Sequence, residues 1–481
     1  MSMNGGPGGP MARNGATPAS LNGAGRFAGR RHLSPFFYGW WIVTAGFGSM
    51  AMSGALMFHA FGVYVVFLQD EFGWSRTTLA IAFALQRVES GLLGPIDGWL
   101  VDHFGPRKMM FVGIVIFGVG FMLLSVTNGL PMFYLAFLVL AVGAALGSFM
   151  PASVAVVNWF IKKRATALAW MMLGLAGGGL AAPLVAAGME TFGWRAFSFA
   201  SGVIIMVVGL PLAALLRHHP EDYGWKPDGE TTQQAAASHS GMDGFEADSA
   251  PPKAPEPEYS FNARQALRTQ AFWLIGIGHG LSLVVIGAVN VHFIAHVHES
   301  LGFSVTIAAS MLTIMTVTQV VGQMAGGYLG DRYDKRLLIV VAMLFNAGAL
   351  ALLAFAATLW MVVAFAVLNG IGFGARIPLT TALRADYFGG KYYGTITGFS
   401  SMVVTVGIII GPLAAGFSYD YLGSYTIGFA ALALIASFGA FIFVFTKKPV
   451  HPDARRFRPG PLIPDVPEGP ETPSQVPVAT R

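Results

Sequence analysis

An arginine with the chemistry to bind an anion lies inside a long apolar stretch of the sequence. Arg376 follows a glycine-rich segment and comes ten residues before Asp386, about 15 Å further along a helix. Its planar guanidinium can bind a carboxylate through two parallel hydrogen bonds. The alternative is a structural arginine that donates to backbone carbonyl groups. The sequence leaves both interpretations open.

Two further charged residues lie in the apolar stretch 76–101. Arg87 is a second candidate for anion binding, and Glu89 is a candidate for carrying a proton. Residues two positions apart do not share a helix face, so we expect each of them to have a partner elsewhere. A structural ion pair between helices is the alternative for both residues.

Histidines add two more candidates for carrying a proton. His59 and His279 lie in apolar stretches, and imidazole titrates close to neutral pH. A structural or interfacial role is the alternative for each. The histidine spacing predicts no metal site, and we expect no metal and no cofactor.

The elements that must carry these side chains are membrane-spanning helices. The chain has 481 residues, of which 54% are hydrophobic and only 11% are charged, whereas soluble proteins average about 25% charged. Apolar runs of roughly 20 residues can cross a lipid bilayer, and backbone polar groups inside lipid are paired within helices. We therefore predict an all-α membrane protein with twelve transmembrane helices, at 38–68, 76–101, 108–127, 131–160, 164–190, 195–217, 270–297, 304–330, 336–357, 360–388, 392–420 and 424–446.

The distribution of Lys and Arg predicts the orientation of these helices. Basic residues gather in the tails, in the central loop and in the loops after even-numbered helices, whereas only Arg76 and Arg195 lie in loops on the other side. The positive-inside rule then places both termini in the cytoplasm. We expect the protein to lie in the plasma (inner) membrane. Because the basic residues indicate topology, we expect no nucleic-acid partner.

A repeated loop divides the chain into two halves. Gly98 to Lys108 and Gly327 to Arg336 have similar sequences, and their first glycines are 229 residues apart. This period is too long for a solenoid repeat and indicates a duplicated six-helix half. The expected parts are a disordered cytoplasmic tail at 1–35, a first half at 36–218, a cytoplasmic linker at 219–268, a second half at 269–446 and a flexible cytoplasmic tail at 447–481.

The repeated loop resembles the signature Gly-x-x-x-Asp-(Arg/Lys)-x-Gly-(Arg/Lys)-(Arg/Lys) of the major facilitator superfamily. The residues that carry the resemblance are Gly98, Asp102, Gly105 and Arg107 in the first copy, and Gly327, Asp331 and Arg332 in the second. The resemblance implies that these loops form a gate. It places Asp102 near Gly394 and Thr395 and Asp331 near Thr166, each at the start of a helix.

Aromatic segments narrow the resemblance further. Phe37-Tyr38-Gly39-Trp40-Trp41 and Phe72-Gly73-Trp74-Ser75-Arg76 resemble the oxalate–formate antiporter and monocarboxylate transporter branch. The chain departs from that branch at two positions. Gln323 stands where the branch often carries an arginine, and Ser400 stands near the position of a lysine. Oxalate, a dianion, is therefore the least supported substrate, and Gln323, Ser400 and Asn369 become candidates for substrate binding.

These features predict a secondary transporter that works by alternating access as a monomer. We expect a small organic anion of the monocarboxylate type as the substrate, with a coupling proton. An efflux transporter of lipophilic drugs or neutral metabolites is one alternative, and a transporter-like sensor without net flux is another. The sequence contains no phosphate-binding loop and no nucleophile–base set, so we do not expect an enzyme.

Overall fold

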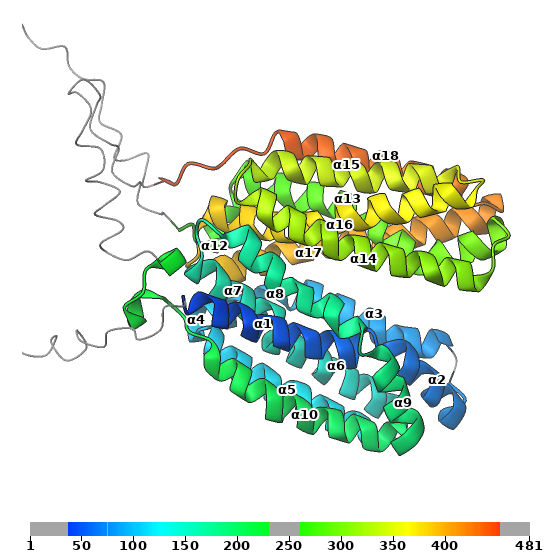
Figure 1. The fold of residues 1–481 in the computed structure, drawn as a ribbon, viewed down its shortest axis with the longest axis horizontal. Coiled ribbons are helices and arrows are strands. Elements are labelled where there is room, and N and C mark those ends of the chain that lie inside the picture. Colours follow the sequence, from blue (N-terminus) through cyan, green and yellow to red (C-terminus); the bar gives the residue numbers. More distant parts are fainter. Residues whose placement is uncertain (1–36, 75, 230–259, 453–481) are drawn as a thin grey trace, which may run out of the picture. The chain divides into compact units, whose positions relative to one another are not determined.

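The computed structural model describes residues 37–74, 76–229 and 260–452. The expected tails and linker fall wholly or partly outside these ranges. All contacts discussed below lie within the unit that begins at Tyr38. Figure 1 shows its helices as two groups, α1–α10 and α13–α18.

The first group corresponds to the predicted first half. Its helices are α1 Gly39–Ser53, η1 Gly54–Phe58, α2 Phe61–Phe72, α3 Arg76–Leu92, α4 Gly94–Phe104, α5 Pro106–Ser125, α6 Leu130–Gly147, α7 Phe149–Trp159, α8 Arg164–Gly179, α9 Ala182–Phe192 and α10 Trp194–Leu215. Two short 3₁₀ turns follow, η2 Glu221–Tyr223 and η3 Pro227–Gly229.

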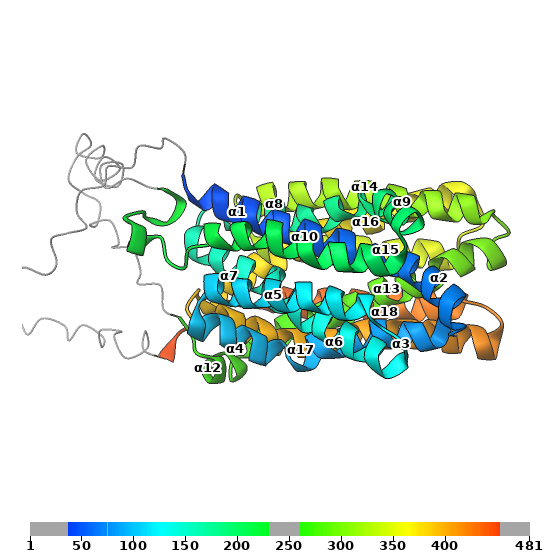
Figure 2. The same cartoon turned by 90° about the horizontal axis from the view of Figure 1, so that it is seen from below.

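The second group corresponds to the predicted second half. Its helices are α12 Ala263–Leu267, α13 Gln270–Ala295, η4 His296–Ser300, α14 Val305–Gly330, α15 Lys335–Ala354, α16 Leu359–Phe388, α17 Tyr393–Leu422 and α18 Thr426–Val444. Figure 2 shows that the long helices of both groups run along one common direction.

Several predicted spans are built from two helices placed end to end. The second span breaks between α3 and α4 at Gly94-Pro95, and the fifth breaks between α8 and α9, just before Pro183. Proline lacks a backbone N–H, so it fits the first turn of a new helix and disfavours the interior of a continuous one. α1 and α2, and α6 and α7, are similarly paired, which gives twelve membrane segments in two six-helix halves.

The surface of these segments suits a lipid bilayer. Among the described residues, nine helical segments have the length and hydropathy to cross a membrane, and α8 with α9, which meet at a bend of 43°, forms a tenth. Large apolar side chains such as Leu184, Phe417 and Leu434 are exposed on the outside of the bundle. Such side chains are compatible with contact to lipid tails, whereas their exposure to water would be unfavourable.

The two halves meet along two seams. In one, α3 and α4 pack on α17, and in the other, α8 packs on α14 and α16. A side chain on Gly98 of α4 would overlap the carbonyl oxygen of Gly394 in α17, and one on Gly398 would overlap that of Gly94. Glycine is therefore required where these two backbones touch. We call the end of the bundle that carries the Gly98–Asp102 and Gly327–Asp331 loops the motif end.

Candidate transport site and gate

The first signature aspartate bonds to a helix of the other half. Asp102, at the end of α4, accepts hydrogen bonds from the backbone N–H of Gly394 at 2.9 Å and of Thr395 at 2.6 Å. The Thr395 hydroxyl donates a third bond at 2.7 Å. The first amides of a helix have no partner within the helix and lie at its positive end, so a carboxylate satisfies them well. The contact implied by the family resemblance is present.

The second signature aspartate makes the corresponding contact. Asp331, at the end of α14, accepts hydrogen bonds from the backbone N–H of Ala165 at 2.8 Å and of Thr166 at 3.0 Å, at the start of α8. Gly327, one turn earlier, packs directly on Ala169. The sequence repeat is thus a structural repeat, with one carboxylate reaching across from each half. The gating role of these contacts remains a prediction.

The other signature residues shape the loops without bridging the halves. Gly105 has a φ of 87° and lets the chain turn from α4 into α5. The guanidinium of Arg332, just after α14, lies 3.5 Å from the centre of the Tyr328 ring in α14. Arg107 is exposed at the start of α5.

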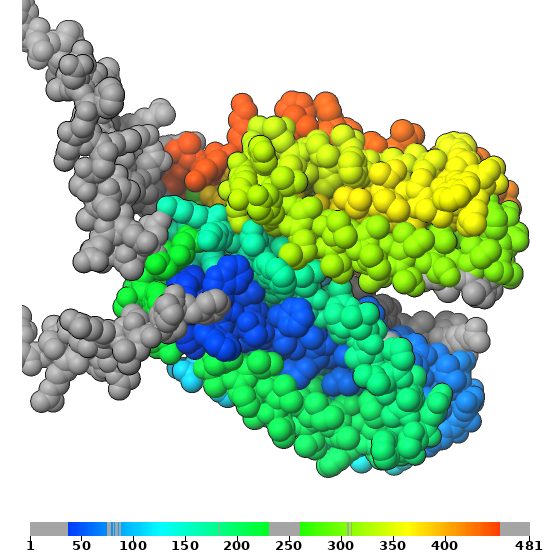
Figure 3. All heavy atoms as spheres, in the orientation of Figure 1, coloured from blue at the N-terminus to red at the C-terminus, as the bar shows by residue number. Residues whose placement is uncertain are grey.

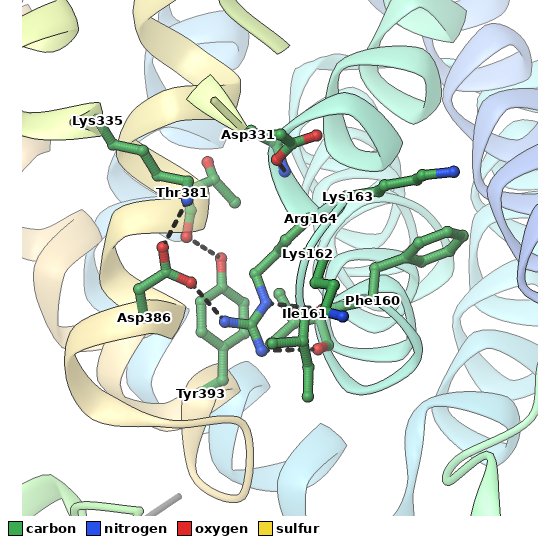
Figure 4. A network of polar contacts seen from close by, with 12 residues as sticks. Phe160, Ile161, Lys162, Lys163, Arg164, Asp331, Lys335, Thr381, Asp386 and Tyr393 are labelled. Carbon is green, nitrogen blue, oxygen red and sulfur yellow. Dashed lines mark hydrogen bonds and ion pairs between the residues drawn. The ribbon is translucent and has the colours of Figure 1, made fainter. Parts of the chain in front are cut away.

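A charge network between α8, α15 and α16 closes the same end (Figure 4). Asp386 binds Arg164 at 2.6 Å and Lys335 at 2.8 Å. Arg164 is buried and also donates to the backbone oxygens of Phe160 at 2.9 Å and Val157 at 3.1 Å. Arg164 and Asp386 are 222 residues apart in the sequence, and no pattern in the sequence pairs them, so this network was not predicted.

Hydrogen bonds between the halves gather at the motif end. Within the described ranges, they are those of Asp102, Asp331, Arg164 and one deeper bond from Gln323. In the last of these, the Gln323 side chain donates to the Ala169 carbonyl oxygen at 2.9 Å. Figure 3 shows the surfaces of the two halves in contact at this end. The structure is therefore the state in which the motif end is closed.

A cavity of about 400 Å³ lies between the halves. Residues of α1, η1, α3, α4, α6, α7 and α8 line it from the first half, and residues of α14, α16 and α17 line it from the second. Its lining is mainly apolar, with Met50, Phe58, Met150, Met172 and Leu175. Polar side chains are interspersed with these apolar ones, as is typical of a site for a small molecule with an apolar body.

Two of the predicted site residues line this cavity. Gln323 lies at its wall, and so does His59, whose Nε2 is 3.2 Å from the Leu175 carbonyl oxygen. Glu89 is buried next to the lining residue Ser90, whose hydroxyl donates to the Glu89 carboxylate at 3.2 Å. The three residues are therefore close enough to the cavity to act on its contents.

Arg376 and His279 lie inside the second half and are not among the residues that line the cavity. The Arg376 side chain is completely buried, and one of its guanidinium nitrogens donates to the Ser282 hydroxyl of α13. The next residue, Ile377, does line the cavity. Arg376 is thus directly behind the cavity wall.

The remaining candidates take different positions. Ser400 is buried, and its neighbour Ser401 lines the cavity instead. Asn369 accepts hydrogen bonds from the Asn346 amide through both its backbone and its side-chain oxygen, at 3.0 and 3.1 Å, and so ties α15 to α16. Arg87 is part of α3, but its side chain lies outside what the structure describes.

Two functional candidates were missed by the sequence analysis. Asp97 lines the cavity and is buried. It comes directly before Gly98, the first residue of the signature loop, and was not considered as a separate site residue. Arg384 is buried in the same predicted span as Arg376. The predicted span 360–388 includes Arg384, so its position within an apolar stretch was the signal that could have identified it.

The comparisons with known proteins agree with this architecture. A model of the Major Facilitator Superfamily matches residues 42–294 and 275–476. The chain belongs to this superfamily. As a superfamily member, it is an integral membrane transporter with twelve helices in two halves.

The relatives include proteins named for organic acids. Monocarboxylate transporter 13 of Rattus norvegicus is 26% identical over 421 residues, covering 84% of this chain and 88% of the relative. The benzoate transport protein of Acinetobacter baylyi is 24% identical over 427 residues, covering 82% and 88%. The crystal structure of the E. coli fucose:proton symporter matches with a TM-score of 0.64 at 13% identity, covering 86% of this chain and 98% of that one, and shows a shared fold.

Proposed function

We propose that this transporter moves a small organic acid with an apolar body, together with a proton, by alternating access. The observation that carries the proposal is the cavity between the halves, which combines an apolar lining with a carboxylic acid. Asp97 lines it, with Ser53, Ser90 and Gln319 as further polar groups. An aromatic or alkyl monocarboxylate matches this mixture, and the names of the relatives support that class of substrate.

Asp97 and Glu89 are the proposed proton carriers. Both are buried, and each is 4% exposed. A carboxyl group in an apolar lining can bind a proton in one state and release it when the other state exposes it to water. The two carboxyl groups lie within electrostatic range of each other, so binding one proton between them relieves their repulsion. His59, at the cavity wall, is a further candidate.

The motif end is the proposed cytoplasmic end, in the plasma (inner) membrane. Lys162, Lys163 and Lys391 lie in its loops and Lys335 begins α15 at the same end, which fits the positive-inside rule. In this orientation, the closed motif end means that the cavity can exchange substrate only with the outside. Breaking the contacts of Asp102 and Asp331 would open the cytoplasmic route. A monomer is the proposed unit of this cycle.

One specific observation favours a second candidate, an efflux transporter of lipophilic or neutral compounds. Among the described residues, no Lys or Arg side chain lines the cavity. An anion bound there would have no described Lys or Arg side chain as a direct partner, whereas a neutral amphiphile would not need one.

Gradient-driven uptake into proteoliposomes separates the two candidates. We expect accumulation of labelled benzoate when the lumen is alkaline, and loss of accumulation when a protonophore is added. Asp97→Asn should reduce accumulation by at least about tenfold, which corresponds to 1.4 kcal/mol, and should preserve benzoate exchange without a gradient. Glu299→Gln, an exposed acid at the opposite end, is the matched control. Accumulation of a neutral amphiphile but not of benzoate would establish the second candidate instead.

A further inference from the structure

A cluster of buried polar groups interrupts the apolar core of the second half. On α13, His279 and Ser282 separate the apolar residues 271–275 of one core cluster from 284–297 of the other. Arg376 faces them from α16. Apart from its bond to Ser282, the guanidinium leaves Nε and Nη2 without a hydrogen-bond partner among the described residues, and His279 leaves Nδ1 unpaired in the same way.

Arg384 extends this cluster towards the motif end. It lies two helical turns beyond Arg376 on α16, is 8% exposed, and has an Nε with no partner among the described residues. His279 is within electrostatic range of both guanidinium groups. Tyr393, in the first turn of α17, interacts with Arg384 and donates its hydroxyl to the Thr381 carbonyl oxygen at 3.4 Å.

The described acids of this region are already engaged elsewhere. Asp386 is two residues from Arg384, yet its two oxygens bind Arg164 and Lys335. The carboxylate of Asp102 faces the backbone of Gly394 and Thr395. Among the described residues, these two buried arginines of α16 therefore have no acidic partner. Arginine keeps its charge in proteins, and a buried charge without a partner is strongly destabilising, so the cluster needs an anion.

We propose that Arg376, Arg384 and His279 form an internal binding site for the carboxylate group of a small anion. The unpaired guanidinium nitrogens are the donors that a carboxylate accepts from, and a neutral imidazole supplies one more. The inference rests on the proposed function in one respect, since it assigns the site to the carboxylate of the transported acid.

The position of the site gives it a place in the transport cycle. One end of the cluster adjoins the cavity, because Ile377 lines the cavity next to Arg376. The other end adjoins the gate, because Tyr393 precedes the two residues that bind Asp102. When the motif end opens, α17 must move away from α4. The carboxylate then passes from an acidic, apolar cavity to a basic site on the way to the motif end.

Formate is a suitable probe, since it has a carboxylate and no apolar body to occupy the central cavity. The melting temperature of the purified full-length protein would be measured in formate, chloride and gluconate at equal ionic strength. We expect formate to raise it in a saturable manner. Arg384→Gln and Arg376→Gln should each increase the half-saturating formate concentration at least tenfold. Arg264→Gln removes an exposed arginine of α12 and should leave the response unchanged.

Melting without formate separates a binding role from a structural one. If the role of these arginines is to bind an anion, they are unpaired without one. Arg384→Gln should then melt at the same temperature as the native protein or higher, because it removes an unpaired charge. A structural arginine would lower the melting temperature equally with and without formate, and this result would overturn the proposal. Arg376→Lys provides a second variant that keeps the charge, in case Arg376→Gln does not fold.

Two further outcomes are decisive. A response to chloride as strong as the response to formate would overturn the assignment to a carboxylate. A formate response that depends on Arg384, in a protein that accumulates no benzoate, would support the site and would count against the proposed function alone.

Discussion

Asp102 and Asp331 occupy equivalent positions in the two halves, 229 residues apart, and each binds two backbone amides at the start of a helix in the opposite half. The two contacts are exchanged reciprocally: α4 reaches α17, and α14 reaches α8. Neither contact depends on a basic side chain. Opening the motif end must therefore break both sets of amide–carboxylate bonds.

Asp102→Ala should shift the transporter towards states with an open motif end. Hydrogen bonds to a charged group contribute about 1.5–3 kcal/mol each, so the closed state should lose at least tenfold in population. The native chain has no cysteine, and Thr397, close to the gate, is 1% exposed. Labelling of Thr397→Cys with N-ethylmaleimide should accelerate at least tenfold when Asp102→Ala is added.

Asp334→Ala is the matched control for this experiment. Asp334 caps its own helix by accepting the Arg336 backbone N–H at 2.8 Å, and this bond does not join the halves. It should leave the labelling rate of Thr397→Cys unchanged. Equal rates in the Asp102→Ala and native backgrounds would remove the gating role.

Asp386→Asn should destabilise the closed end more than Lys335→Gln does. Arg164 has a side chain only 3% exposed, so loss of its partner leaves a buried charge, whereas Lys335 is 16% exposed and more easily reaches water. The cost of breaking a buried pair is about 3–5 kcal/mol. Melting temperatures of the two single variants and the double variant would give the coupling. Arg336→Gln, which breaks a looser 3.6 Å pair with Asp334, is the control, and an equal loss in all variants would contradict this ranking.

Asp228 should stabilise the loop before α8. Its carboxylate accepts the backbone N–H groups of Ile161, Lys162 and Lys163 at 3.0, 2.8 and 3.2 Å. It does so with a φ of 61°, which Asn and Gly tolerate better than Ala. We expect Asp228→Ala to cost about 1–2 kcal/mol, as for the loss of a helix cap. Asp228→Asn should cost less.

Melting temperatures of the purified variants would test this order. Glu221→Ala, which removes an exposed acid from the same segment, is the control and should be neutral. If Asp228→Asn and Asp228→Ala melted together with the native protein, the three amide bonds would not contribute to stability.

Mild acid should destabilise the segment after α10. Burial, helped by the neighbouring His219 and opposed by Asp222, lowers the pKa of His218 to about 4. The unfolded chain has a histidine pKa of about 6.5, so it binds the proton first. The contribution of His218 to stability is therefore complete above about pH 6.5 and is lost as the pH falls towards 4. The melting temperature should fall between pH 7.5 and 5.5, and this fall should be smaller in His218→Gln. His103→Gln, at an exposed position, should keep the native pH dependence.

Hydropathy and the repeated loop were sufficient to predict the twelve-helix architecture. Long apolar stretches of this kind form helices that span a bilayer. The duplicated loop indicated that the same set of helices occurs in each of two halves. The breaks inside the spans were not predicted, although Gly94-Pro95 and Pro183 mark two of them. A hydropathy pattern does not distinguish a continuous helix from two stacked ones.

The site was predictable only where a contact is fixed by the backbone. The partners of Asp102 and Asp331 followed from the family resemblance, because helix starts offer the same amides in every member. The place of Arg376 depends on the rotation of α16, which sets whether a side chain faces the cavity or the core of its own half. Neighbouring residues on one helix can therefore face different surroundings: Ile377 lines the cavity, and Arg376 does not. Charge and apolar surroundings alone do not contain that information.

The backbone contact between α4 and α17 has a mechanical consequence. Gly94 and Gly98 meet Gly394 and Gly398 without any intervening side chain. The two surfaces can therefore part or roll past each other with no rotamer to rearrange and no interlocked chains to withdraw. Resistance to separation along this contact should therefore come mainly from the directional hydrogen bonds of Asp102 at its end. We therefore expect that loss of the Asp102 hydrogen bonds alone is enough to change the rate at which the motif end opens.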